Sequence, residues 1–171
     1  MTVKTICAIL VVVLTSSCWP TSVSFTDTGS MPPEWKFFHL TTLEIQAPNA
    51  PLSYAATLSE SLKDGIQNNT RLLLSNTLDQ AQVQIEGVIM NYSVSPIALV
   101  EGDNAAQNRL SISVRFTIFT TEPEEDEMTV TSTRFVDYTS SQDFATVETA
   151  LLEEINTQII QDLINKLLSN W

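Results

Sequence analysis

The chain has few of the side chains from which catalytic and metal sites are built. Its 171 residues include one histidine (His39), two cysteines (Cys7 and Cys18) and four scattered glycines. This inventory excludes the usual Cys and His sets of zinc sites and offers no glycine-rich phosphate loop. A Ser-His-Asp triad would depend on His39, which lies in an aromatic segment, and no nucleophile-elbow motif occurs. We therefore expect no catalytic residues, no metal, no cofactor and no enzymatic activity.

Basic side chains are also scarce. Eight Lys and Arg residues stand against twenty Asp and Glu, which gives a formal net charge of −12. Binding to nucleic acid requires clustered cations that displace counterions, and a polybasic membrane surface requires them as well. The sequence therefore argues against nucleic acid as a partner and against a membrane contact made by clustered charge.

The longest apolar run, residues 6–14, is too short to span a bilayer, which needs roughly 20 apolar residues. Lys4 precedes this run, and Thr15, Ser16 and Ser17 lead directly into Cys18. A cationic start, a short apolar stretch and small residues are typical of a removable signal. A cysteine at the cleavage point indicates a lipoprotein, so we expect residues 1–17 to be a signal peptide and Cys18 to carry acyl chains. The alternative is ordinary secretion with Cys18 unmodified.

Residues 18–171 would then form the mature protein, with seven basic and all twenty acidic side chains. Residues 18–33 are rich in Ser, Thr and Pro without a hydrophobic period, which predicts an extended tether. Residues 34–171 have the size of one domain and need no disulfide.

The first half of this domain predicts a strand and a helix, and residues 71–74 are a candidate for the start of a further strand. Residues 35–45 are rich in aromatic and β-branched side chains, which favours a strand. Leu58, Leu62 and Ile66 recur every four residues, as on one face of a helix. Ser53 is the expected N-cap of that helix, and Asn68-Asn69 its expected end.

The second half predicts three strands and a long helix. Apolar residues change from odd to even positions around Gly87, so we expect a β-bulge there. Residues 110–118 alternate strictly between apolar and polar, which predicts a strand with one buried face. A tip at 122–127 and a strand over 128–138 follow, and an apolar stripe over 147–167, capped by Asp143, predicts the helix.

This order of elements predicts an α+β fold, a two-layer α/β sandwich. Two amphipathic helices would pack on one face of a mostly antiparallel four-stranded sheet. The opposite face would stay polar and open to a partner.

Arg109 and Arg115 are expected on that polar face, with Arg134 on the next strand. Guanidinium groups bind phosphate in bidentate fashion, so the three arginines are candidates for contact with a partner or an anionic lipid. The alternative is a solvated sheet face with cross-strand pairs. The acidic run 122–127 lacks the ligand spacing and the glycine of a calcium loop and reads as a solvated hairpin tip.

Several segments, in order along the chain, resemble the LptE family of lipopolysaccharide-assembly lipoproteins. They are the signal with Cys18, Met31-Pro-Pro33, Tyr92-Ser-Val-Ser-Pro-Ile-Ala-Leu99, Asn108-Arg-Leu-Ser-Ile-Ser-Val-Arg-Phe116, Ser140-Ser-Gln142, Leu151-Leu-Glu-Glu-Ile155 and Asn165-Lys-Leu-Leu-Ser-Asn-Trp171. The resemblance implies two helices on a four-stranded sheet.

The resemblance also implies a function. Family members plug a large outer-membrane β-barrel of the LptD type and assist the assembly of lipopolysaccharide into the outer leaflet. It implies an acylated Cys18 and attachment to the outer membrane, facing the periplasm or inside the barrel lumen, with lipopolysaccharide as a further candidate partner. Trp19 stands where an Asp would favour retention in the inner membrane. The alternative from another class is a periplasmic ligand-binding lipoprotein.

Overall fold

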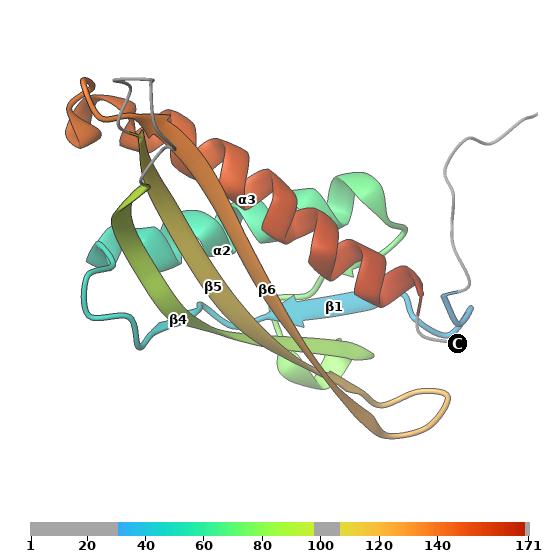
Figure 1. Ribbon diagram of the computed structural model, residues 1–171. Coiled ribbons are helices and arrows are strands. Elements are labelled where there is room, and N and C mark those ends of the chain that lie inside the picture. The colour runs from blue at the N-terminus through green and yellow to red at the C-terminus, as the bar shows by residue number, and fades with distance from the viewer. Residues whose placement is uncertain (1–30, 98–106, 170–171) are drawn as a thin grey trace, which may run out of the picture.

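The computed structural model describes residues 31–97 and 107–169, so Cys18 and most of the expected tether lie outside the described residues. These residues form an α+β fold of two layers (Figure 1). Helices α2 (Leu52–Asn69) and α3 (Phe144–Leu168) cover one face of a twisted sheet. The expected two-layer arrangement is confirmed, with two long helices in the described part of the chain.

The sheet contains six strands among these residues. Their order is β3-β1-β4-β5-β6, and the short β2 pairs with β4. Strands β4, β5 and β6 form an antiparallel meander, whereas β1 is parallel to both β3 and β4. The bounds are β1 (Phe37–Leu40), β2 (Glu44–Ile45), β3 (Leu73–Leu74), β4 (Val83–Ile97), β5 (Gln107–Thr120) and β6 (Asp126–Thr139), and a short helix η1 (Leu78–Gln80) precedes β4.

The predicted four-stranded, mostly antiparallel sheet is therefore wrong in detail. The expected strand over 35–45 is divided into β1 and β2, and both pair in parallel with β4. The connection from β1 through α2 returns the chain to the same end of the sheet, which makes β3 and β4 parallel to β1. Strands β2 and β3 have two residues each, too few to show a period of two.

Three of the four helix ends lie at or close to the residues that the sequence predicts. Helix α2 ends at Asn69 as predicted, and α3 begins after Asp143, whose Oδ1 accepts a hydrogen bond from the backbone N–H of Ala145 at 3.4 Å. Helix α3 extends to Leu168, close to the predicted end of the stripe. The predicted cap at Ser53 is wrong, because α2 begins at Leu52 after Pro51 and has no side-chain cap.

One continuous core lies between the helices and the sheet. It includes the even-numbered apolar residues of β5 and the stripe of α3, in which Ile155, Ile159 and Leu163 are fully buried. Met31 also belongs to this core and is only 5% exposed. Packing therefore begins upstream of residue 34, where we expected the domain to start.

The β-bulge occurs later than predicted. In the β4–β5 register Ile89 is opposite Val114 and Asn91 is opposite Ser113, so Met90 is the extra residue. Gly87 serves close packing instead, because a Cβ there would lie 2.9 Å from Leu43 Cγ and 3.1 Å from the Phe116 ring. Only a residue without a side chain lets these two groups cover β4 at this point.

A second glycine sets the spacing between the helices. A Cβ on Gly65 of α2 would lie 2.4 Å from Ile160 Cγ2 of α3, far inside van der Waals contact. The two helices can therefore approach this closely only because position 65 has no side chain.

Replacing Gly65 with Ala tests this contact. An unobstructed Gly→Ala change in a helix stabilises by up to about 1 kcal/mol, whereas overpacking costs about 1–3 kcal/mol. We expect a net loss of about 1 kcal/mol in the free energy of unfolding, measured by urea denaturation. In the Gly65→Ala background, Ile160→Ala should cost less than it does alone. Additive costs would show that the two residues do not constrain each other.

Candidate functional site

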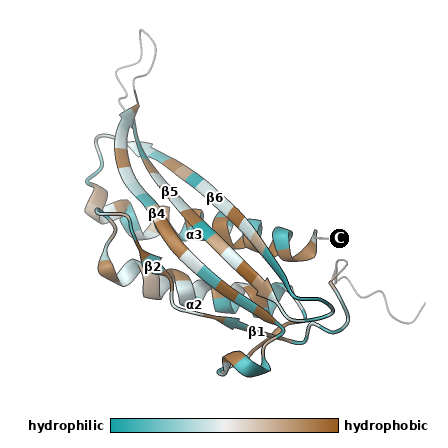
Figure 2. Ribbon diagram, turned by 90° about the horizontal axis from the view of Figure 1, so that it is seen from below, coloured by the Kyte–Doolittle hydropathy of each residue, from teal (hydrophilic) through white to brown (hydrophobic). Residues whose placement is uncertain are grey.

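The face of the sheet opposite the helices is lined with hydroxyl groups, and Figure 2 views the molecule from this side. The β4–β5–β6 registers place the outward residues of the three strands in rows across this surface. Its hydroxyl-bearing members are Ser93, Ser95, Ser111, Ser113, Thr117, Thr129, Thr131 and Thr133. We call this surface the open face; it is the candidate functional site.

Arg109 lies on the open face, and Asp137 already binds its guanidinium. Nε is 2.7 Å from Oδ1 of Asp137, and Nη2 is 2.8 Å from Oδ2. The guanidinium also stacks 3.7 Å from the centre of the Phe135 ring, which is 50% exposed. The hydrogen bonds from Arg109 lower the pKa of Asp137. Arg109 therefore forms a cross-strand ion pair with Asp137, which is the alternative that the sequence left open.

Arg115 lies on the same face three rows away, between Val88 of β4 and Thr131 of β6. Its side chain is exposed, and within residues 31–97 and 107–169 it makes no hydrogen bond or ion pair. Its neighbours supply hydroxyl and methyl groups but no carboxylate in the same row. Arg115 is thus the arginine of the open face that is available to an external anion.

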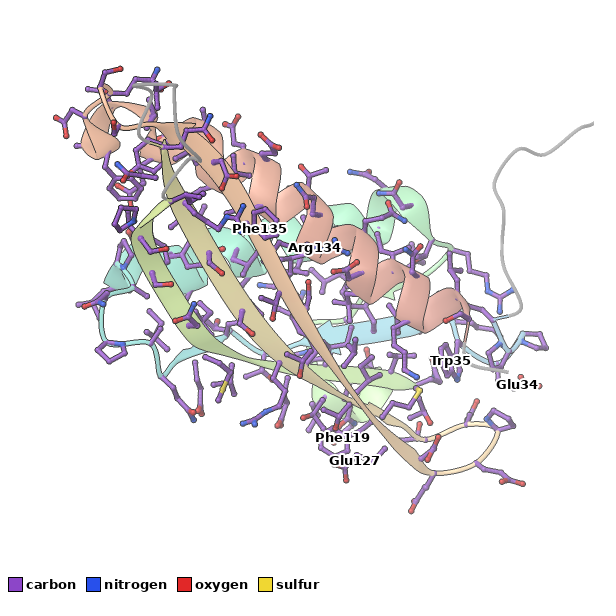
Figure 3. The ribbon with its side chains drawn as sticks, in the orientation of Figure 1. Glu34, Trp35, Phe119, Glu127, Arg134 and Phe135 are labelled. Carbon is purple, nitrogen blue, oxygen red and sulfur yellow. The ribbon has the colours of Figure 1, made fainter. Side chains whose placement is uncertain are left out.

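Arg134 points to the opposite side, so the expectation of one surface with three arginines is wrong. It is opposite the buried Ile112, and its guanidinium binds Asp162 of α3, with Nε 2.8 Å from Oδ2. Ser132 donates a further hydrogen bond of 2.5 Å to the same carboxylate oxygen. Figure 3 shows Arg134 beside α3. These contacts, chiefly the bonds from Arg134, lower the pKa of Asp162 and fasten α3 to β6.

A buried tyrosine network, which the sequence analysis missed, joins both helices to β4. Tyr54 donates a hydrogen bond of 2.8 Å to Asn156, and Tyr92 donates one of 2.6 Å to Glu148. The two rings meet edge to face, 5.7 Å apart. Burial is the main cause that raises the pKa of both phenols. The polar Asn156 within an apolar stripe was the sequence signal for this network, whose role is to position α2 and α3.

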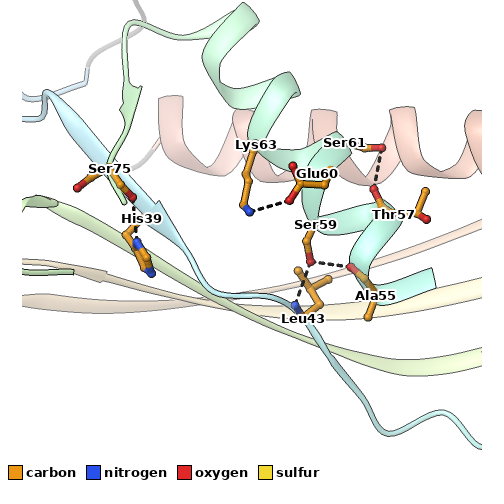
Figure 4. Close-up of polar contacts among 9 residues, drawn as sticks. All are labelled: His39, Leu43, Ala55, Thr57, Ser59, Glu60, Ser61, Lys63 and Ser75. Atoms are coloured by element: carbon orange, nitrogen blue, oxygen red, sulfur yellow. Dashed lines mark hydrogen bonds and ion pairs between the residues drawn. The ribbon is translucent and has the colours of Figure 1, made fainter. Parts of the chain in front are cut away.

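The N-terminal part of the sheet is held by structural polar contacts (Figure 4). Ser59 Oγ accepts from the backbone N–H of Leu43 at 3.0 Å and donates to the carbonyl of Ala55 at 2.6 Å. His39 lies in β1, half-buried, with Nδ1 3.0 Å from the carbonyl oxygen of Ser75. These contacts tie β1 and the segment before β2 to their neighbours.

The described residues contain no cluster of three or more His, Cys, Asp or Glu side chains arranged to hold a metal ion. No helix within the same residues is long and apolar enough to cross a membrane. The acidic tip between β5 and β6 packs on Trp35, whose indole N–H donates to the carbonyl of Glu122 at 2.6 Å.

The LptE lipopolysaccharide-assembly family matches residues 40–167, which include both helices and nearly all of the sheet. The chain belongs to this family. The sequence resemblance to LptE is thereby confirmed, and the match supports a general role in lipopolysaccharide assembly. A comparison with curated proteins found no match.

Solved structures share the fold of this LptE-family chain at low sequence identity. Lipoprotein B from Nitrosomonas europaea is 15% identical, with a TM-score of 0.54 over 88% of this chain and 92% of that one. A neuraminyllactose-binding hemagglutinin homolog from Helicobacter pylori is 10% identical, with a TM-score of 0.57 over 89% of this chain and 90% of that one. At these identities the likeness concerns the fold alone.

The Arg134–Asp162 pair predicts a pH-dependent contribution to stability. A carboxylate whose pKa is lowered in the folded state stabilises above its unfolded pKa, and this contribution is lost as the pH falls through the folded pKa. Because Arg134 is partly exposed, Arg134→Gln should cost about 1 kcal/mol or less at pH 7. The cost should shrink as the pH is lowered from 7 toward about 2, because protonation of Asp162 removes the ion pair.

Urea denaturation at both pH values measures this difference. Arg115→Gln is the matched control, since that side chain has no partner among the described residues, and it should change stability little at either pH. A cost for Arg134→Gln that does not depend on pH would contradict the role assigned to Asp162.

Proposed function

We propose that this LptE-family chain is a non-enzymatic subunit of a lipopolysaccharide-export complex. In this proposal acyl chains on Cys18 attach it to the outer membrane, residues 18–30 connect that anchor to the folded domain, and the domain lies within the lumen of an LptD-type β-barrel. The family match over residues 40–167 supports the general role. The observation that carries the finer proposal is the open face, a broad polar surface on a sheet whose other side is covered by α2 and α3.

The chemistry of the open face suits a barrel lumen. The inside of a large membrane barrel is polar and water-filled, in contrast to its lipid-facing surface. Rows of Ser and Thr hydroxyls can both donate and accept hydrogen bonds, so they fit a polar wall without requiring one sign of charge. The partner would also be a closed surface of β-strands, which a broad sheet face can lie against.

Arg115 is the residue of the open face that would recognise an anion. Arg109 and Arg134 are already bound to Asp137 and Asp162, so an external ligand would have to displace a bidentate carboxylate. Arg115 has no such competitor among the described residues. It would pair with a carboxylate of the lumen wall or with a phosphate of lipopolysaccharide, both of which match the guanidinium fork.

Co-purification from mild detergent tests the proposal. The wild-type chain should bring down a large outer-membrane barrel in equal amounts. Arg115→Glu should reduce that recovery, because like charges in a closed interface repel and the guanidinium hydrogen bonds are lost. Lys63→Glu on α2 is the matched reversal on the helix side and should leave recovery unchanged.

Recovery of the wild-type chain as a lone monomer would contradict the barrel proposal and favour a periplasmic ligand-binding lipoprotein. Full recovery of the barrel with Arg115→Glu, at an unchanged melting temperature, would instead remove Arg115 from the contact while leaving the complex itself in place.

Cys18→Ala tests the anchor separately. The small residues before Cys18 and the absence of a long apolar run make this thiol the expected attachment site. The variant should lose acyl labelling and either appear in the soluble periplasmic fraction or keep its signal peptide. Unchanged labelling with radioactive fatty acid would exclude Cys18 as the site of attachment.

A further inference from the structure

Three large apolar side chains are exposed at one corner of the sheet. Phe37 is 38% exposed, Leu73 is 56% exposed and Leu78 is 48% exposed. Phe37 and Leu73 are register partners on the parallel strands β1 and β3, and both precede residues that face the core. Leu78 begins η1, and its carbonyl is 3.5 Å from Nε2 of Gln84, whose register partner is His39 of β1. We call these three residues the apolar corner.

The chain enters the domain beside this corner. The Arg71 guanidinium donates to the carbonyl of Met31 at 2.8 Å and also to that of Pro32. Two residues after Arg71, the backbone N–H of Leu73 donates to the carbonyl of Lys36 at 2.9 Å. The first described residues are therefore fastened to the same short segment that carries Leu73.

The distance to the proposed anchor is short. Thirteen residues, 18–30, separate the proposed lipid from Met31, and they span at most about 45 Å when fully extended. A tether of this length makes contact between the domain and the lipid surface intramolecular, so a small apolar patch suffices where it would be too weak for a free protein. The corner nearest the tether is the part of the domain that meets the bilayer first.

We infer that the apolar corner projects from the periplasmic opening of the barrel and rests on the membrane that holds the lipid anchor, with Phe37, Leu73 and Leu78 inserted among the lipid headgroups. The lipid contact rests on the proposed acylation of Cys18 but not on binding to the barrel. Exposed Lys36 flanks the corner and faces the phosphate layer. A contact of this kind fixes the orientation of the domain relative to the bilayer.

The surrounding charges define which lipid surface fits. Besides Lys36 and Arg71, the neighbourhood contains Glu34, Asp79 of η1 and the acidic tip, which packs on Trp35. Carboxylates so close to the corner oppose a strongly anionic surface. The occupant is therefore a bilayer of net neutral, zwitterionic lipids.

A single fluorescent label tests the contact. The acylated mature protein carrying Leu78→Cys, labelled with an environment-sensitive fluorophore, is reconstituted into phosphatidylcholine vesicles. Cys18 is blocked by its lipid and no other cysteine remains in the mature chain, so the label is specific. The matched control is Leu52→Cys, the first residue of α2, which is 90% exposed. Figure 1 shows that α2 begins on the side of the molecule away from η1.

We expect the label at position 78 to shift its emission to the blue and to be quenched by brominated acyl chains, whereas the label at position 52 does neither. The shift should be lost when Phe37 and Leu73 are replaced by Ser in the labelled protein, and it should weaken when phosphatidylglycerol replaces half of the lipid. Circular dichroism melting checks that the Ser variant remains folded.

Equal quenching at positions 78 and 52, in protein with confirmed acylation, would overturn the inference and leave the proposed complex with the barrel standing. A shift at position 78 that requires the purified barrel and is insensitive to brominated lipid would also overturn it, since the corner would then contact protein. Loss of barrel co-purification with a retained lipid contact would instead contradict only the proposed function.

Discussion

The strict alternation of β5 is the constraint on which the remaining structure depends. Its even-numbered apolar residues, from Leu110 to Ile118, are all completely buried. Because side chains alternate across a strand, this fixes which residues of β4 and β6 face the helices and which face outward. The helices must then cover the even side, and the odd side becomes the open face. A shift of one residue in this register would bury Arg109 and Arg115 and expose the core.

Pairing across the sheet then decides what each arginine can do. Arg109 and Asp137 are opposite one another, so a cross-strand pair forms on the open face. Arg134 is opposite Ile112 and faces the helix layer, where Asp162 and Ser132 satisfy it. Arg115 is opposite Thr131 and Val88, which offer no carboxylate. The three side chains are chemically the same. The strand register therefore decides which arginine is bound within the domain and which is available to an external anion.

Sequence patterns predicted the elements with strong periodicity and missed those that depend on pairing. Strand β5, the end of α2 and the Asp143 cap follow from local spacing alone. The side of Arg134 requires the β5–β6 register, which the length of an irregular tip does not reveal. The predicted position of the bulge is wrong because the apolar side chains of Val88 and Met90 suggest a buried face, although Met90 is exposed. In the sequence, an apolar side chain on the exposed face of a strand looks the same as a change in the alternation of buried and exposed positions.

The packing of the two glycines also could not be predicted from local sequence. Gly87 suggested a bulge because glycine costs least at irregular backbone, yet Leu43 and Phe116, distant in sequence, require the missing Cβ. Gly65 lies inside a helix, where local propensity disfavours it, and only the approach of Ile160 explains it. In both cases glycine is required by a contact with residues distant in sequence, so a pattern of neighbouring residues cannot predict it.

The open face and the apolar corner divide the exposed surface by chemistry in a way that suits a tethered subunit. The corner is apolar and lies where Arg71 fastens Met31, so it is next to the point where the chain enters the domain. The open face extends from that corner along β4, β5 and β6, so fixing the corner also fixes the direction in which the hydroxyl rows are presented. A partner in the same membrane would then meet the open face in one orientation. This reduces the rotational freedom that association must otherwise remove, so modest polar contacts can hold the complex.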